Sequence, residues 1–422
     1  MNRGLWGAAT SAHQVEGGNR ANDWWAWEEA GRVPEKSGEA SDHYRRFRED
    51  FRLARELGHT AHRLSLEWSR LEPREGEWDE AAFRHYEEVF DSLRSFGLEP
   101  VVTLHHFTNP LWFAEKGGWT LPGATEKFSR YVSRVVQRFS PYVKYWITIN
   151  EPLIYVYQGF VLGRWPPGER SFDKALGVIR ELMRAHIAAY QILHRDSRNS
   201  ECYVSLAHHT IVFTPCRPNW RDRATCFLRH WFVNRLILRS LQTGFVFFPG
   251  VFCERLPAKG TLDFLGINYY SRDFIRSAGW GRTERFGEVC PKDHHRGQIG
   301  ELNDLGWEVY PEGLYQVIAS LRSLRLPVLI TENGVTTPDD SLRERSIEAH
   351  LAELRRARNE GVTVWGYFYW SLVDNFEWAE GFGHHFGIVG VDYATQARKV
   401  RPSAGTLRKG CQDIFGTRSK ET

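Results

Sequence analysis

Cysteine is scarce in this chain of 422 residues, and none of its six cysteines lies within the first two hundred positions. The six are Cys202, Cys216, Cys226, Cys253, Cys290 and Cys411. Because they form no CxxC pair, their spacing argues against a disulfide framework and against a zinc site. We therefore expect a protein of the reducing cytoplasm that holds no metal.

Long apolar runs are also missing. Residues 1–7 (MNRGLWG) contain no apolar leader, and no later stretch approaches the roughly 18 apolar residues that a membrane-spanning helix needs. A strong charge of one sign is absent too, since the formal net charge is only +3. These absences predict no membrane and no nucleic acid as partner, and they favour a neutral small-molecule substrate.

Cofactor motifs are absent as well. The sequence has no Walker-type or dinucleotide-binding glycine motif and no HExxH, so we expect no cofactor. Aromatic residues, by contrast, are abundant at 14%, with 17 Trp. Such rings pack a large core, and they can also lie against the apolar faces of sugars.

Strand-like and helix-like patterns alternate from end to end. The strands are expected at 5–10, 61–66, 100–104, 145–150, 203–207, 264–268, 328–332 and 364–369, and the helices at 42–57, 80–96, 127–139, 172–194, 222–243, 311–324 and 341–360. Eight strands with crossover helices predict an α/β fold, a single (β/α)8 TIM barrel. We expect this domain to span residues 1–415, followed by a disordered tail at 416–422. The poorly patterned segment 271–305 is expected to be a loop on the active face.

Two of the strand patterns end on a carboxylate, in Ile147-Thr148-Ile149-Asn150-Glu151-Pro152 and in Leu329-Ile330-Thr331-Glu332-Asn333-Gly334. The carboxyl ends of barrel strands all open on one face, so Glu151 and Glu332 can face a single cleft there. Paired carboxylates are what cleavage of a glycosidic bond requires. A barrel enzyme of another chemistry, such as a metal-dependent aldolase, would need metal ligands or a lysine at the strand ends, and neither is found there.

Four segments in order resemble family-one glycoside hydrolases, the retaining β-glucosidase and β-galactosidase group built on a (β/α)8 barrel. These segments are WGAATSAHQVEG at 6–17, TINEP at 148–152, TENG at 331–334 and YWSLVDNFEW at 369–378. The resemblance covers essentially the whole chain.

The resemblance implies a role for each catalytic candidate. Glu332 would be the nucleophile, and Glu151 would act first as acid and then as base. The negative charge of Glu332 would raise the pKa of Glu151 and keep it protonated for the first step. Arg63 and Tyr270 would be the partners of the nucleophile.

The resemblance also implies a group of substrate-binding side chains. They are Gln14, His106, Asn150, Asn268, Trp307, Trp370, Glu377 and Trp378. His105 competes with His106 for its role and is interpreted as a packing residue. Trp307 would stack on the departing group, and Trp165 is a candidate for narrowing the same entrance. The charge of Glu377 would repel a 6-phosphate, which argues for unphosphorylated sugars.

We therefore expect a retaining β-glycosidase that hydrolyses terminal non-reducing β-D-glucosyl residues of β-glycosides and oligosaccharides, in the context of cellulose degradation. Galactosides and fucosides are expected as further substrates. One alternative is a transglycosylating enzyme of the same chemistry. Another is a catalytically inactive relative that binds sugars or proteins, although such proteins typically lose a carboxylate and both are present here. The sequence leaves a monomer and a homo-oligomer equally open.

Overall fold

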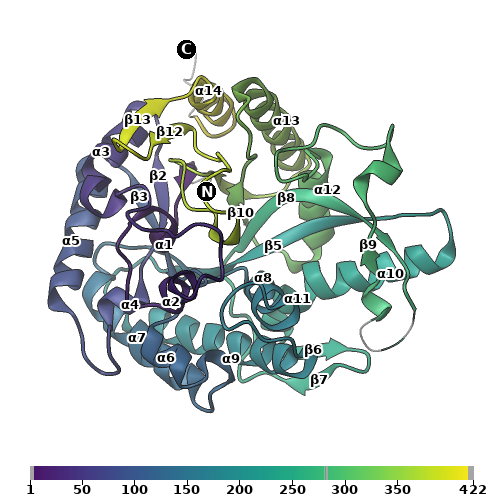
Figure 1. Cartoon of the computed structure of the whole chain (residues 1–422), viewed down its shortest axis with the longest axis horizontal. Helices are drawn as coiled ribbons and strands as arrows, with labels where there is room; N and C mark the ends of the chain where they lie inside the picture. Colours follow the sequence, from purple (N-terminus) through teal and green to yellow (C-terminus); the bar gives the residue numbers. More distant parts are fainter. Residues whose placement is uncertain (1–3, 280, 282–283, 417–422) are drawn as a thin grey trace.

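The eight predicted strands form one closed barrel of parallel strands in the computed structural model, which describes residues 4–279, 281 and 284–416 (Figure 1). Each strand pairs with its neighbours in chain order, and β10 closes the ring by pairing with both β8 and β11. The strands are β1 (Leu5–Ala9), β2 (Ala61–Ser65), β3 (Glu99–His105), β4 (Tyr145–Asn150), β5 (Tyr203–Pro215), β8 (Leu265–Arg276), β10 (Val328–Asn333) and β11 (Val364–Trp370). The predicted TIM barrel is thereby confirmed. Of the predicted tail, all but Gly416 lies outside the described residues.

Helices surround the barrel where the sequence predicts them (Figure 1). They are α3 (His43–Glu56), α5 (Glu80–Ser95), α7 (Ala124–Phe139), α9 (Phe172–Asp196), α10 (Trp220–His230), α11 (Leu236–Thr243), α12 (Glu312–Leu321) and α13 (Asp340–Asn359). The predicted helix 222–243 is two helices, because a π-helical segment at Trp231–Arg235 separates α10 from α11. Side-chain caps fix where several helices begin. Before α5, for example, the Asp79 side chain accepts hydrogen bonds from the backbone N–H groups of Ala81 and Ala82.

Several elements were not predicted. The helices are α1 (Ala12–Val15), α2 (Asp23–Glu29), α4 (Trp68–Leu71), α6 (Leu111–Glu115), α8 (Pro152–Val156) and α14 (Ser403–Phe415). The strands are the hairpins β6 (Phe245–Phe248) with β7 (Phe252–Arg255) and β12 (Val389–Asp392) with β13 (Ala397–Val400). Most are too short for a periodic pattern to emerge, whereas α14 packs against α13 and completes the helical layer.

The core has two parts. Inside the barrel, Tyr145, Phe264, Trp365 and Phe368 are buried together, whereas the outward-facing strand residues pack against the helices. Gly366 has no room for a side chain, because a Cβ there would lie 1.9 Å from the Leu5 carbonyl oxygen. The barrel is therefore filled by side chains and leaves room for a ligand only at its ends.

Two barrel strands continue far beyond the ring. β5 and β8 stay paired out to Pro215 and Ile275, and β9 (Glu288–Val289) joins β8 as an antiparallel edge strand (Figure 1). Segment 271–305, predicted as a loop, therefore begins as strand. We call residues 208–215 and 269–276 of these strands, together with β9, the β5–β8 arm.

Directly after two strands of the arm lies a cysteine pair that the sequence reasoning argued against. Cys216 and Cys290 are joined as a disulfide, with their Cα atoms 6.4 Å apart, so the expectation that no disulfide forms is wrong for this structure. The two residues are 74 positions apart, and only the pairing of β5 with β8 brings them together. Among the described helices, none is long and apolar enough to cross a membrane.

Candidate active site

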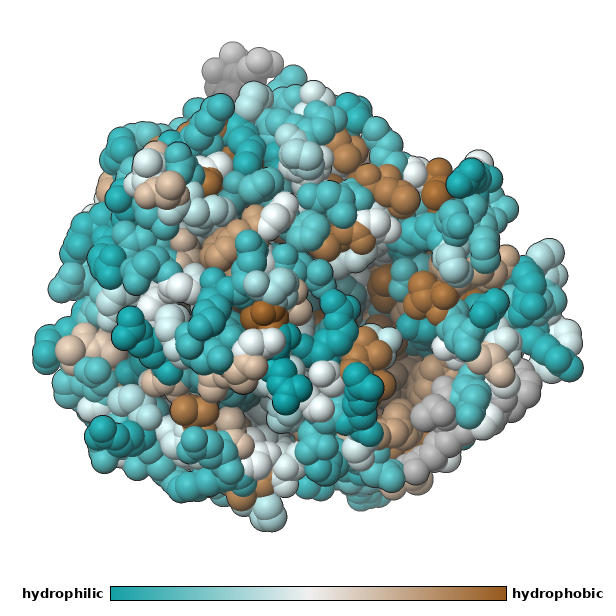
Figure 2. Space-filling view, in the orientation of Figure 1, coloured by the Kyte–Doolittle hydropathy of each residue, from teal (hydrophilic) through white to brown (hydrophobic). Residues whose placement is uncertain are grey.

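A large cavity of about 830 Å³ opens at the carboxyl ends of the strands, beside the β5–β8 arm. Figure 2 shows a hollow on this face with apolar side chains along its walls. Ten of the twelve predicted site residues line the cavity, and they are Gln14, His106, Asn150, Glu151, Tyr270, Trp307, Glu332, Trp370, Glu377 and Trp378. The other two, Arg63 and Asn268, contact cavity residues from below. The fold thus brings the predicted set together.

Glu332 lies at the end of β10, where the pairing register with β8 shifts after Ile330. Its Oε1 accepts a hydrogen bond from Arg63 Nη1 at 2.5 Å, and its Oε2 accepts one from Tyr270 Oη at 2.6 Å. Arg63 is completely buried, and its second nitrogen donates to Asn150 Oδ1 at 2.7 Å. Two donors therefore fix both carboxylate oxygens of Glu332.

Glu151 follows β4 in a left-handed backbone conformation, with φ of 43°, directly before Pro152 begins α8. Such a conformation is costly for a residue with a side chain and is concentrated at functional sites. The Glu151 N–H donates to the Ala207 carbonyl, which ties this turn to β5. Its Oε1 accepts a hydrogen bond from Asn268 Nδ2 at 2.8 Å and lies 3.3 Å from His209 Nδ1.

The pKa values of the two carboxyls run opposite to the sequence-based expectation. Burial raises the pKa of Glu332 to about 6, with Glu151 adding to the rise and Arg63 opposing it. Burial also raises the pKa of Glu151, but the nearby His209 and the Asn268 hydrogen bond outweigh it and bring this pKa below its ordinary value. His209 in turn has a raised pKa because Glu151 faces it. The repulsion between the two carboxyls thus acts on Glu332, while His209, a residue of β5 that the sequence-based site did not include, lowers the pKa of Glu151.

Gln14 and Glu377 form a polar pair at one end of the cavity. Gln14 Nε2 donates to Glu377 Oε2 at 3.2 Å and to the Phe376 carbonyl at 2.9 Å. Burial, together with the charges of Glu332 and Glu151, raises the pKa of Glu377 to about 8. At neutral pH this carboxyl is mostly protonated. A 6-phosphate beside it would therefore be disfavoured by the cost of burying its charge, and less by repulsion from Glu377.

The remaining polar and aromatic candidates lie around the same cavity end. Asn150 Nδ2 lies 3.2 Å from His106 Nε2, and the His106 ring stacks on Trp370 with centroids 5.9 Å apart. The Trp378 ring also stacks on the His106 ring, with the two centroids 6.2 Å apart. His105 contacts Asn109 instead and lies among Trp119 and Tyr155, as its interpretation as a packing residue requires.

Two tryptophans line the approach to the carboxylates. Trp307 is 38% exposed and meets the edge of Tyr270 at 5.8 Å. Trp165 lines the cavity but is also packed against Phe107, with centroids 4.9 Å apart. Trp165 is therefore both a wall residue and a core residue.

Sequence reasoning missed His209 and the apolar wall of the cavity. His209 lies on β5 just beyond the predicted strand end, so a longer strand assignment would have placed it beside Glu151. The apolar wall comes from α8, α9, the β5–β8 arm, the π-helical segment after α10 and the segment before β9, and it includes Ile154, Phe172, Ile179, Ile211, Phe232 and Phe286. No local pattern distinguishes these residues from ordinary core residues.

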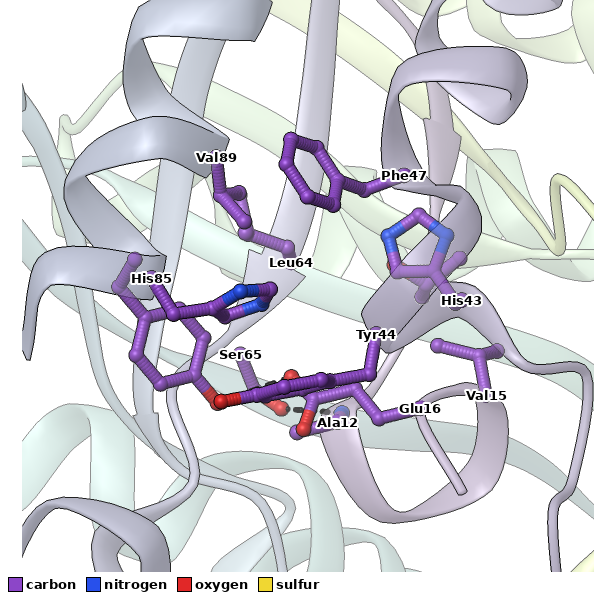
Figure 3. A pocket seen from close by; sticks show the side chains of 12 residues that line it. Ala12, Val15, Glu16, His43, Tyr44, Phe47, Leu64, Ser65, His85 and Val89 are labelled. Atoms are coloured by element: carbon purple, nitrogen blue, oxygen red, sulfur yellow. Dashed lines mark hydrogen bonds between the residues drawn. The ribbon is translucent and has the colours of Figure 1, made fainter. Parts of the chain in front are cut away.

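A second cavity lies between α1, α3, α5 and β2 and has a different character (Figure 3). Its volume is about 10 Å³, which is room for at most one water molecule. Glu16 there accepts hydrogen bonds from Arg70 Nε at 2.7 Å and Tyr86 Oη at 2.8 Å. These buried polar groups satisfy one another and form no ligand site.

A parallel barrel with two buried carboxylates on its carboxyl-terminal face, one held by Arg and Tyr donors, defines a glycoside hydrolase. The sequence model of glycosyl hydrolase family 1 matches residues 2–409, and the chain belongs to this family. The chain is 32% identical to beta-glucosidase A of Thermotoga maritima over 94% of each chain, and 29% identical to a beta-galactosidase of Pyrococcus woesei over 96% of this chain and 95% of that one. A solved beta-glycosidase of Pyrococcus horikoshii is 37% identical, with a TM-score of 0.88 over 98% of this chain and 96% of that one. The protein is thus a β-glycosidase of the retaining type that is general to the family.

Proposed function

We propose that Glu332 is the nucleophile and Glu151 the acid/base of this β-glycosidase. The observation that carries the assignment is the pair of donors on Glu332. Arg63 and Tyr270 both favour its ionised form and orient one oxygen for attack. In the first step, Glu332 bonds to the anomeric carbon while Glu151 gives its proton to the departing oxygen.

In the second step, Glu151 acts as a base. The glycosyl ester removes the negative charge of Glu332, so Glu151 can accept a proton from water as that water attacks the anomeric carbon. The ester breaks, the sugar leaves with retained configuration, and Glu332 is ionised again. His209 is the proton partner that balances the charge of Glu151 between these steps.

We propose that Gln14, His106, Asn150, Asn268, Trp370, Glu377 and Trp378 hold the non-reducing sugar. The Gln14 and Glu377 pair can donate to and accept from neighbouring hydroxyls, because Glu377 is mostly protonated at neutral pH. Such a pair accepts both equatorial and axial 4-hydroxyls. This supports glucosides as substrates, with galactosides and fucosides also cleaved.

The outer part of the cavity points to an apolar leaving group. Much of its wall is made of aliphatic and aromatic side chains, and two of its charged residues are paired, Arg164 with Glu380 and Glu288 with Arg276. A second glucose unit would need hydrogen-bond partners for its hydroxyls, whereas an alkyl or aryl group needs only apolar contact. This favours alkyl and aryl glucosides over cello-oligosaccharides. Cellulose degradation and a cytoplasmic location stay predictions from the sequence.

The nucleophile is tested by replacing Glu332 with Gly. The variant should lose hydrolysis of nitrophenyl β-glucoside by about 10⁴-fold, the scale on which loss of an essential catalytic group acts. Added azide should restore turnover and yield the α-glycosyl azide. Rescue with a β-glycosyl azide would refute the assignment. A matched Glu151→Gly variant should give the β-glycosyl azide instead, because its nucleophile is intact.

A further inference from the structure

A cluster of cysteine and histidine lies at the end of the β5–β8 arm, outside the barrel. Cys216 follows β5, Cys290 follows β9, and His295 ends the short helical turn η5 (Lys292–His295). One potential metal-binding atom of each residue lies within 4.8 Å of the other two. Elsewhere in the part of the chain that the structure describes, no other group of three such residues comes this close.

Backbone hydrogen bonds hold both cysteines against the same strand. The Cys216 N–H donates to the Ile275 carbonyl at 2.8 Å, and the Cys290 N–H donates to the Phe274 carbonyl at 2.7 Å. Because these carbonyls belong to adjacent residues of β8, the sheet holds the backbones of both cysteines side by side. The two cysteines are therefore placed near one another before any ligand arrives.

His295 is the second, independent observation. It is only 4% exposed, and its Nε2 has no hydrogen-bond partner among the described residues. Its ring stacks on Phe274, with centroids 3.8 Å apart and planes at 9°. A disulfide offers no strong hydrogen-bond partner to a buried imidazole, whereas a metal ion can bind its nitrogen. A metal ion therefore explains the buried, unpartnered Nε2 of His295 better than the disulfide alone does.

His294 supplies a fourth group. Its Nδ1 lies 3.7 Å from Cys290 Sγ, and its side chain is exposed and free to adjust. Two sulfurs and two imidazoles are a common ligand set for structural zinc. Bonds of about 2.3 Å to sulfur and about 2.0–2.1 Å to nitrogen place tetrahedral ligand atoms roughly 3.3–3.8 Å apart, so the side chains would adjust to this spacing, and His294 would turn toward the other three residues.

We propose that Cys216, Cys290, His294 and His295 bind one zinc ion when the two cysteines are thiols. Zinc binding releases the two thiol protons and moves no electrons, whereas disulfide formation also removes two electrons and needs an oxidant. Both cysteines enter the folding chain as thiols. Zinc binding therefore competes with disulfide formation for these thiols, and zinc binding is favoured in a reducing compartment.

The zinc site would hold one wall of the cavity in place. Phe286 and Val289 line the cavity and lie within four residues of Cys290, so fixing Cys290 to β8 fixes this wall. The site is closed by four protein ligands and has a structural role, with no part in bond cleavage. The structural effect rests on the proposed function of the cavity, but zinc binding itself does not.

Zinc content of the untagged full-length protein tests the proposal. The protein is purified with a phosphine reductant and without chelator, and about one zinc ion per chain is expected. Cys290→Ser and His295→Ala should lose this zinc, whereas Cys253→Ser should keep it, because Cys253 is an exposed thiol on β7 far from the cluster in sequence. Retention of zinc by Cys290→Ser would overturn the proposal.

Cobalt titration of the metal-free, reduced wild type gives an answer even where a variant fails to fold. A tetrahedral Co²⁺ site with two thiolates should produce a strong sulfur-to-cobalt charge-transfer band and intense visible bands, and zinc should abolish both. A reduced protein in which all six cysteines react with a thiol reagent, yet no such band appears, would contradict the site. Hydrolysis of nitrophenyl β-glucoside, measured in parallel, tests the proposed function separately.

Discussion

The guanidinium of Arg63 lies 2.5 Å from the carboxylate of Glu332 at the bottom of the cavity, and it is fully buried. An arginine cannot lose its proton there, so it supplies a permanent positive charge. It opposes the rise in the pKa of Glu332 that burial causes, and the net pKa is about 6. Glu332, the proposed nucleophile, is thus mostly ionised at neutral pH although it is almost completely buried.

Tyr270→Phe tests the second donor to Glu332. Loss of a hydrogen bond to a charged group costs about 1.5–3 kcal/mol, so kcat/KM should fall roughly 10- to 150-fold. Because the Tyr270 bond lowers the pKa of Glu332, its loss should also move the acidic limb of the pH profile upward from about pH 6. Tyr269→Phe is the matched control, since its hydroxyl donates to the Tyr310 carbonyl and makes no contact with Glu332. An unmoved acidic limb in Tyr270→Phe would count against this role.

His209→Asn tests the proton partner of Glu151. Glu151 and Glu332 titrate as a pair that must hold one proton for the first step, so activity declines as pH rises and the pair loses that proton. His209 lowers the pKa of Glu151, and its removal should therefore move the alkaline limb of kcat/KM to higher pH. His194→Asn removes a comparable pair with Asp263 outside the cavity and should leave the profile unchanged. A shift to lower pH in His209→Asn would contradict the proposed pairing.

Glu377 is tested by two replacements that differ in hydrogen bonding. Glu377→Gln keeps a neutral polar group of the same shape, and since the pKa of Glu377 is about 8, the variant should resemble the wild type at pH 6. Glu377→Ser removes the contacts and should raise KM for nitrophenyl β-glucoside about 5- to 100-fold, the cost of one or two hydrogen bonds. Equal KM values in the two variants at pH 6 would speak against a sugar-binding role.

The apolar wall is tested with alkyl β-glucosides of increasing chain length. Each added CH₂ buried in the cavity contributes about 0.8 kcal/mol, so kcat/KM should rise roughly fourfold per carbon until the wall is filled. Ile211→Ser should flatten this rise, because Ile211 lines the cavity from the arm. Val212→Ser is the control on the same strand, since Val212 does not line this cavity. A flat series in the wild type would refute an apolar leaving-group site.

The sequence by itself determined the barrel and the identity of the two carboxylates. Strands such as Val328–Asn333 are buried on both faces, so their apolar runs can be recognised from the sequence alone. Glu151 and Glu332 directly follow or end such runs, and the rule that carboxyl ends share one face places them together. These inferences need only local residue patterns.

The tertiary structure alone decided what surrounds the carboxylates. His209 reaches Glu151 because β5 continues past the barrel, and Cys216 meets Cys290 across 74 positions because the same extension pairs with β8. The direction of the pKa shifts followed from these neighbours, since burial and nearby charges act through space. Contacts between distant segments leave no periodic signal in either segment. For this reason the sequence predicted the pair of Glu151 and Glu332 but neither the neighbouring His209 nor the cysteine and histidine cluster.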